Sequence, residues 1–174
     1  MSSTGAGDRR KTILHVGLIF VLSSILWVFT THFRYSFTNS CGAHFFWKTD
    51  CPEPLFRNTF VSFTPRPNPI LPEYVHSLIK RIFCLPGESV VRKELHYWCR
   101  ANGMFIDMGK TKLKSRKGKP VTPFLYDRHR NHASYVLEDG EFFVVGLPVP
   151  DSYDSRYFGP IPKERIEGCY IALF

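Results

Sequence analysis

A lysine inside an apolar run is the first residue in this sequence that could do chemistry. It lies in "SLIKRIFCLPGESVV" (77–91), where a strand's period of two predicts two apolar faces, Leu78, Lys80, Ile82 and Cys84 on one and Ile79, Arg81, Phe83 and Leu85 on the other. Burial favours the neutral amine, and a general base needs its pKa lowered from about 10.4 by roughly three units, about 4 kcal/mol. Arginine cannot be neutralised this way, so Lys80 and not Arg81 is the candidate base.

A second group of polar residues lies in the loop "PVPDSYDSRYFGPIP" (148–162), which contains Asp151, Ser152, Asp154, Ser155 and Arg156 within six positions. Alone, this composition is typical of a solvated turn. Together with a buried lysine, it supplies the parts of a Ser–Lys hydrolase. A hydroxyl such as that of Ser152 could orient the neutral amine. A carboxylate touching Lys80 would keep it charged, so we expect Asp154 to pair with Arg156 or to cap the loop.

These two segments resemble the conserved boxes of type I signal peptidases. "IKRIFCLPGESV" is similar to the lysine box, "SYDSRYFGPIP" to the last box, and "RNTFVSF" to the strand between the serine and lysine boxes. The matches occur in family order over most of residues 36–174. The compact size and the ending "RYFGPIPKERIEGCYIALF" look most like the conjugative-transfer branch, which matures plasmid pilin precursors and in some members joins the pilin's ends into a circle.

The resemblance implies a serine nucleophile shortly after a membrane helix. The candidate is Ser40 in "TNSCGAHFFW", with Thr38 two positions earlier where the family often has a hydroxyl that helps bind the oxyanion. The family's apolar-Pro signature after the serine is missing here, and Ser36 and Cys41 remain rival nucleophiles. In the implied mechanism Ser40 attacks, Lys80 accepts the proton, the Ser40 N–H and Thr38 bind the oxyanion, and Ser152, Asp154 and Arg156 support the site. No metal or organic cofactor is implied.

An N-terminal helix is predicted to hold this machinery at a membrane. Residues 12–31, "TILHVGLIFVLSSILWVFTT", are long enough to span about 30 Å as a helix, and Arg9, Arg10 and Lys11 precede them. The cations predict a cytoplasmic N-terminus (1–11), an uncleaved inner-membrane anchor (12–31) and an exported domain (32–174), periplasmic by the resemblance. A cleaved signal peptide would need small residues after the apolar run, which ends in "TTHFRYSF".

The remaining chain predicts a mostly β domain of the signal-peptidase kind. Strands are expected in 32–47, "NTFVSFTP", 78–85, "SVVRKELHYW", "MFIDMGK", "PVTPFLY", "EFFVVGLPVP" and "IEGCYIALF". Five cysteines in an exported domain permit disulfides, and the local pairings to test first are Cys41 with Cys51 and Cys84 with Cys99. The seven histidines lack metal-site spacing and are expected to be structural or on the surface.

The substrate expected from the resemblance is an exported precursor, which should bind as an extended strand beside the nucleophile's strand. Three functions stay open: a dedicated pilin-processing peptidase of a transfer apparatus, a housekeeping signal peptidase, and a non-catalytic anchored scaffold. The basic run "KTKLKSRKGK" (110–119) is consistent with a solvated loop or with contact to anionic lipid. It has no interleaved aromatics, which argues against nucleic acid as a partner.

Overall fold

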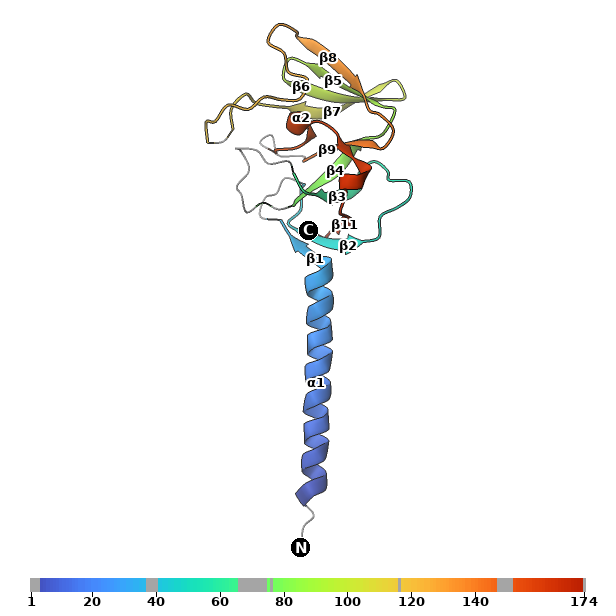
Figure 1. The fold of residues 1–174 in the computed structure, drawn as a ribbon, viewed down its shortest axis with the longest axis vertical. Helices are drawn as coiled ribbons and strands as arrows, with labels where there is room; N and C mark the ends of the chain where they lie inside the picture. Colours follow the sequence, from blue (N-terminus) through green and yellow to red (C-terminus); the bar gives the residue numbers. More distant parts are fainter. Residues whose placement is uncertain are drawn as a thin grey trace.

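The N-terminal helix is the most extended feature of the protein (Figure 1). The computed structural model describes residues 4–36, 41–65, 75, 77–115, 117–146 and 152–173. Helix α1 (Thr4–His32) contains the predicted segment 12–31, and its stretch Lys11–His32 has a mean hydropathy of 2.2 with none of it buried inside the protein. Among the described residues it is the one helix long and apolar enough to cross a membrane, judged by length and composition.

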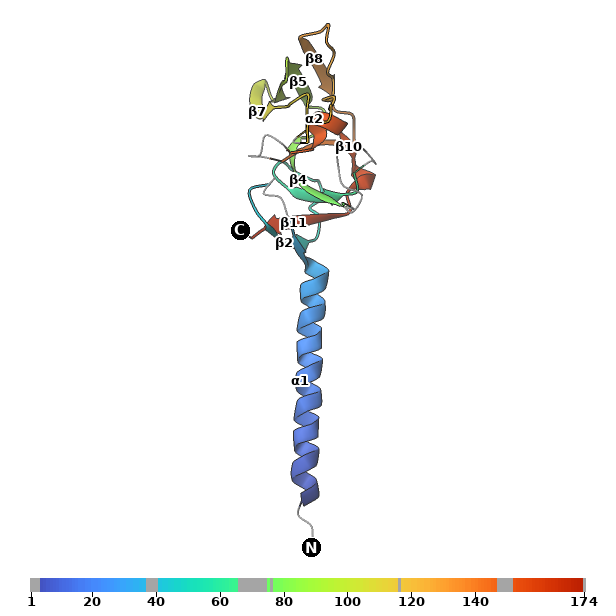
Figure 2. The same cartoon turned by 90° about the vertical axis from the view of Figure 1, so that its left-hand side faces the viewer.

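Two antiparallel sheets build the rest of the chain, which confirms the predicted mostly β class. The seven-stranded sheet has the order β1-β2-β11-β3-β4-β9-β10, and the four-stranded sheet the order β7-β6-β5-β8. The four-stranded sheet lies at the end of the molecule opposite α1 (Figures 1 and 2). The strands are β1 (Phe33–Tyr35), β2 (Phe45–Thr49), β3 (Phe60–Phe63), β4 (Leu78–Cys84), β5 (Ser89–Lys93), β6 (His96–Ala101), β7 (Met104–Lys110), β8 (His132–Val136), β9 (Glu141–Val145), β10 (Ile161–Pro162) and β11 (Gly168–Ala172). Two short helices, α2 (Ser155–Phe158) and the 3₁₀ helix η1 (Lys163–Arg165), complete the fold.

The four-stranded sheet differs from the prediction in three places. "SVVRKELHYW" is not one strand but the hairpin β5–β6, which turns at Glu94 with a positive φ of 55° and pairs Lys93 with His96. No Gly, Asn or Pro marks this turn, so the alternating pattern runs through it. "PVTPFLY" is not a strand, because Pro120 and Pro123 lack N–H groups for a ladder and the segment turns at Pro123 instead. Strand β8 was not predicted, and it pairs with β5.

Strand β4 lies between β3 and β9 and contributes to two core clusters. Ile82 packs with Val61 and the other buried residues of one cluster, whereas Phe83 and Cys84 pack in the cluster that faces the four-stranded sheet. The register against β9 shifts between Ile82 and Cys84, so a bulge interrupts the period of two. The prediction that Cys84 shares a face with Ile82 is therefore wrong.

Two disulfides connect distant parts of the fold. Cys84–Cys99 joins β4 to β6 and confirms one predicted pairing. The pairing of Cys41 with Cys51 is wrong: Cys51 bonds Cys169, 118 residues away, and Cys41 is in neither disulfide. Strand β2 pairs with β11 so that Thr49 lies opposite Cys169, and this long-range pairing brings the two sulfurs together.

Replacing both Cys84 and Cys99 with alanine is expected to lower the free energy of unfolding by about 3 kcal/mol, because the bond closes a loop of 15 residues in the unfolded chain. Chemical denaturation of the full chain in detergent micelles measures this loss. Cys41→Ala is the matched control and should cost about 1 kcal/mol or less, since Cys41 is in neither disulfide. An unchanged denaturation midpoint in the double variant would contradict the expectation.

Candidate active site

Lys80 lies in the middle of the seven-stranded sheet, opposite Val61 of β3. Only 3% of it is exposed. Burial lowers the pKa of its amine, and Arg156 lowers that pKa further, whereas Cys41 and the Asp154 carboxylate act in the opposite direction and raise it. The burial predicted from the sequence is confirmed. A lysine in this environment is suited to accept a proton near neutral pH.

Cys41 reaches strand β4 directly beside Lys80. Its sulfur donates a hydrogen bond to the Ile79 carbonyl oxygen at 3.1 Å, and the residue is half-buried. The thiol is also the largest charge-related influence on the pKa of Lys80 after burial. The segment that follows the predicted nucleophile in the sequence is thus anchored next to the predicted base. Sequence reasoning considered Cys41 as a rival nucleophile and as a disulfide partner of Cys51, and it missed this contact.

The predicted nucleophile Ser40 and its partner Thr38 lie outside the described residues, which end at Ser36 and resume at Cys41. Ser36, a rival candidate, lies after β1, where its N–H donates to the His44 carbonyl oxygen at 2.8 Å. Another hydroxyl, that of Ser62 in the segment "RNTFVSF", lies within strand β3 and is buried at 3% exposure. The assignment of the nucleophile therefore stays a prediction.

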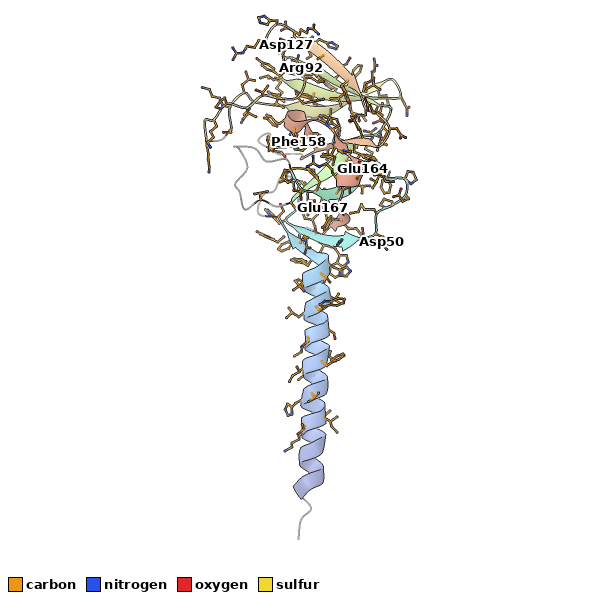
Figure 3. All side chains as sticks on the ribbon, viewed as in Figure 1. Asp50, Arg92, Asp127, Phe158, Glu164 and Glu167 are labelled. Carbon is orange, nitrogen blue, oxygen red and sulfur yellow. A yellow bond between two sulfur atoms is a disulfide. The ribbon has the colours of Figure 1, made fainter. Side chains whose placement is uncertain are left out.

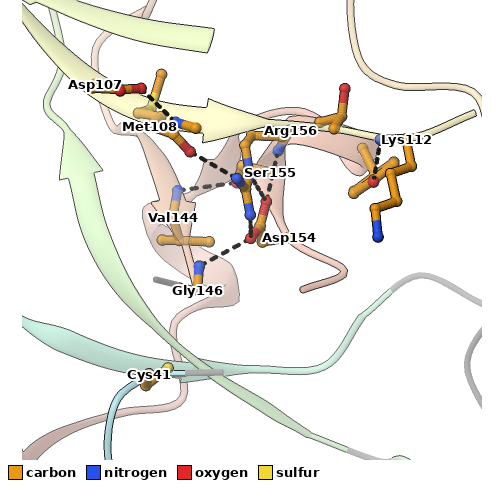
Figure 4. A network of polar contacts seen from close by, with 12 residues as sticks. Cys41, Asp107, Met108, Lys112, Val144, Gly146, Asp154, Ser155 and Arg156 are labelled. Carbon is orange, nitrogen blue, oxygen red and sulfur yellow. Dashed lines mark hydrogen bonds and ion pairs between the residues drawn. The ribbon is translucent and has the colours of Figure 1, made fainter. Parts of the chain in front are cut away.

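Asp154 and Arg156 form a fully buried ion pair at the start of α2 (Figure 4). Arg156 Nε and Nη2 donate to the two oxygens of the Asp154 carboxylate at 2.9 and 2.8 Å. Asp154 also caps α2 by accepting from the Arg156 N–H at 3.1 Å. Both predicted roles of Asp154, the pairing and the capping, are confirmed.

This pair connects three elements around Lys80. Asp154 accepts from the Gly146 N–H at 2.9 Å, just past β9, and Arg156 donates to the Met108 carbonyl oxygen of β7 at 2.7 Å. Burial alone would lower the pKa of Arg156, but the Asp154 carboxylate outweighs it and raises that pKa above its usual value. The guanidinium therefore stays charged, and its charge also lowers the pKa of Lys80.

The two serines of this loop differ in their surroundings. Ser155 Oγ accepts from the Val144 N–H at 3.0 Å and so fastens α2 to β9, a role that the sequence did not indicate. Ser152 is buried at 3% exposure, and its Oγ has no hydrogen-bond partner among the described residues. A buried hydroxyl without a hydrogen bond lowers the stability of the folded protein. The Ser152 hydroxyl is therefore a candidate to bind a further polar group. Its predicted contact with Lys80 stays a prediction.

One cluster in the described part of the chain has the spacing of a metal site, formed by Cys84, Glu88 and Cys99. Its two sulfurs are bonded to each other, and the Glu88 carboxylate is paired with Arg57 at 2.5 Å. The sulfurs are thus used in the disulfide that joins the two sheets, and the carboxylate is used in an ion pair. The cluster is therefore better explained as a structural link than as a metal site.

Comparison with known proteins identifies the family. The family model for signal peptidase, peptidase S26, matches residues 10–174. A probable conjugal transfer protein TraF of Sinorhizobium fredii is 28% identical over 99 residues, 57% of this chain and 46% of that protein. Conjugal transfer protein TraF of Agrobacterium fabrum is 29% identical over 105 residues, 60% of this chain and 53% of that protein. Signal peptidase I V of Bacillus subtilis is 33% identical over 91 residues, 52% of this chain and 54% of that protein.

The chain spans about half the length of these curated relatives. A crystal structure of a signal peptidase I from Enterococcus faecalis aligns with 68% of this chain and 96% of that chain, at 24% identity and a TM-score of 0.39. The family model covers nearly all of the sequence, including the segments around Lys80 and Asp154. The chain belongs to the signal peptidase family, peptidase S26.

Proposed function

We propose that this protein is a membrane-anchored serine endopeptidase that cleaves exported precursors with a Ser40–Lys80 dyad. The observation that carries the proposal is the burial of Lys80 on a central strand, where its pKa is lowered and a neutral amine can act as general base. Membership of the peptidase S26 family supports the reaction class. Ser40 is supported by its place in the sequence, directly before Cys41, whose sulfur contacts the strand at Ile79 next to Lys80.

In the proposed reaction the Ser40 hydroxyl attacks the scissile carbonyl carbon and its proton passes to Lys80. The Ser40 N–H and the Thr38 hydroxyl stabilise the oxyanion. Lys80 then returns the proton to the leaving amine, and an acyl-enzyme ester remains on Ser40. Water releases the product by hydrolysis, or a substrate amine releases it by ring closure. Ser152 orients the Lys80 amine, while the Asp154–Arg156 pair holds the loop.

Helix α1 anchors the domain in the inner membrane in this proposal. The cations Arg9, Arg10 and Lys11 precede the apolar stretch and favour a cytoplasmic N-terminus, which puts the β domain in the periplasm. The substrate is then an exported precursor that lies in the same membrane plane and binds as an extended strand.

The proposed substrate is a pilin precursor of a conjugative-transfer apparatus. Two of the relatives are named conjugal transfer proteins, which supports this choice, and one is named a signal peptidase, which supports the housekeeping alternative. Incubation with candidate pilin precursors followed by intact-mass measurement distinguishes the outcomes, because ring closure leaves the product one water lighter than hydrolysis. Rescue of a host depleted of its own signal peptidase would instead favour the housekeeping function.

Cys41 is a second candidate nucleophile, because its thiol is outside both disulfides and contacts the Ile79 carbonyl oxygen next to Lys80. Ser40→Ala is expected to reduce precursor cleavage by about 1,000-fold or more, and Cys41→Ala by only a few-fold, since Ser40 forms the acyl-enzyme. Precursor cleavage followed by mass spectrometry measures both variants. The opposite ranking, together with inactivation of the wild-type protein by iodoacetamide, would assign the nucleophile to Cys41. Full cleavage in both variants would assign the nucleophile to another residue, such as the rival Ser36, whereas no cleavage by the wild-type protein would leave the scaffold as the remaining function.

A further inference from the structure

The positive charge of this protein is concentrated in one segment. Residues 110–132 contain eight Lys and Arg and one acidic residue, Asp127, so this segment carries a net +7 of the chain's +8. Seven of the eight cations are described, and all seven are exposed: Lys110, Lys112, Lys114, Lys117, Lys119, Arg128 and Arg130. The Asp127 carboxylate accepts from the His129 N–H at 2.8 Å and lies 3.6 Å from Arg130, so it is engaged locally and does not neutralise the rest.

The segment folds around an open depression of about 550 Å³. Leu113, Val121 and Tyr126 give the depression an apolar part, and Thr122, Asp127, Arg128 and His129 give it a polar part. Leu113 is 40% exposed although it is a large apolar residue, so part of this lining is open to solvent. The depression therefore combines a small apolar floor with Arg128 in its lining and with exposed lysines next to its lining residues Leu113 and Pro120; we call it the basic groove.

A buried arginine holds one wall of the basic groove in place. Arg92 of β5 is only 1% exposed, and its Nε and Nη2 donate to the Leu125 and Arg130 carbonyl oxygens at 2.9 and 2.7 Å. Those two carbonyls lie at the ends of the turn that contributes Tyr126, Arg128 and His129, and the Arg92 guanidinium lies 5.7 Å from the centre of the Tyr126 ring. The wall is thus fixed before any ligand binds, which reduces the entropy cost of binding.

The basic groove lies away from α1, on the half of the domain that contains the four-stranded sheet (Figures 1 and 3). Residues close in sequence to its lining are joined to the candidate active site by two hydrogen bonds: the Lys112 N–H donates to the Tyr157 hydroxyl at 2.9 Å, and the Phe124 N–H donates to the Arg156 carbonyl oxygen at 2.8 Å. The basic groove is separate from Lys80, because none of the groove-lining residues is on β4.

We propose that the basic groove binds an acidic peptide segment of a protein partner that inserts an apolar side chain among Leu113, Val121 and Tyr126. Charge complementarity requires an anionic ligand, and the apolar floor favours a ligand with an apolar side chain over a sheet of lipid headgroups. The distance of the groove from α1 along the molecule also argues against the bilayer that α1 would cross. Single-stranded nucleic acid is disfavoured because Tyr126 is the one aromatic residue in the lining.

The test uses the full chain in nanodiscs of neutral phosphatidylcholine and a short fluorescein-labelled peptide of glutamates around one central leucine. Fluorescence anisotropy should show binding that weakens by about tenfold or more when salt is raised to screen the charges. The peptide with glutamine in place of glutamate should not bind, and replacing the central leucine with serine should weaken binding about fivefold.

Variants locate the site independently of activity. Lys114→Glu combined with Arg128→Glu should weaken binding about tenfold or more, because two exposed cations are reversed, Arg128 in the lining and Lys114 next to the lining residue Leu113. Lys163→Glu changes an exposed cation on η1 and should bind like the wild type; the neighbouring Glu164 is labelled well away from Asp127 in Figure 3. Unchanged thermal unfolding verifies that the variants are folded. The salt dependence of peptide binding is measured on the wild-type protein, so it tests the proposal even if a variant fails to fold.

Three results would overturn the proposal. Equal binding of the glutamate and glutamine peptides would show that charge does not select the ligand. Equal loss in the Lys163→Glu control would show that the effect comes from net charge rather than from the basic groove. Capture of phosphatidylglycerol vesicles by the wild type but not by the Lys114 and Arg128 variant, without peptide binding, would assign the surface to lipid.

Discussion

Replacing Lys80 with arginine is expected to reduce precursor cleavage by about 1,000-fold or more, even though arginine is also a long basic side chain. Only a neutral amine accepts the serine proton, and a guanidinium does not lose its charge in a protein. Burial lowers the pKa of Lys80 and so supplies the neutral form that arginine cannot. Cleavage rates of a purified precursor, measured with detergent-solubilised enzyme, test this expectation. The matched control is Arg81→Lys on the same strand, which should retain most of the activity.

The pH dependence of cleavage follows from the same shift. Activity should rise with pH as Lys80 loses its proton, and the midpoint should lie below 10.5, the ordinary value for this amine. A profile with its midpoint at or above 10.5, or full activity in Lys80→Arg, would contradict the role of Lys80 as general base.

Replacing Lys80 with methionine should raise the free energy of unfolding, in contrast to the loss of cleavage expected for Lys80→Arg. Between the lowered pKa of folded Lys80 and 10.5, the unfolded chain binds a proton that the folded protein does not, so the free energy of unfolding rises with pH across this window. Below the window both states are protonated, and the folded state bears the cost of a buried charge. Lys80→Met should therefore remove the slope and stabilise the protein by about 1 to 3 kcal/mol at neutral pH.

Breaking the buried Asp154–Arg156 pair is expected to cause the largest loss of stability. Asp154→Ala should lower the free energy of unfolding by about 3 to 5 kcal/mol, because Arg156, at 1% exposure, would be left with an unpaired charge. Cleavage should fall as well, since this pair holds α2, β7 and β9 together near Lys80. Chemical denaturation in micelles gives the free energy.

A double variant separates the loss of the ion pair from the cost of leaving one buried charge unpaired. Asp154→Leu with Arg156→Met removes both charges and should cost less than the sum of the two single variants by about 2 kcal/mol. Asp127→Ala is the surface control, because its pairing with Arg130 is exposed, and it should cost about 1 kcal/mol or less. Strict additivity of the two single variants would argue that the contact contributes little.

The sequence by itself determined the elements with strong local signals. The apolar stretch of α1, the burial of Lys80, strands β3, β4, β7, β9 and β11, and the pairing of Asp154 with Arg156 were all predictable, because each depends on composition, period or neighbours within a few residues. The Cys84–Cys99 disulfide was predictable for the same reason, since its cysteines are 15 residues apart.

Only the tertiary structure decided the features that depend on pairings far apart in the chain. Cys51 meets Cys169 because β2 and β11 are neighbours in the sheet, a contact across 118 residues that no local pattern records. The same holds for Cys41 beside Ile79, for the bulge that turns Cys84 away from Ile82, and for Arg92, whose buried guanidinium is satisfied by carbonyls of a distant turn. Local sequence specifies which residues prefer burial, but the order of strands in the sheet specifies which of them meet.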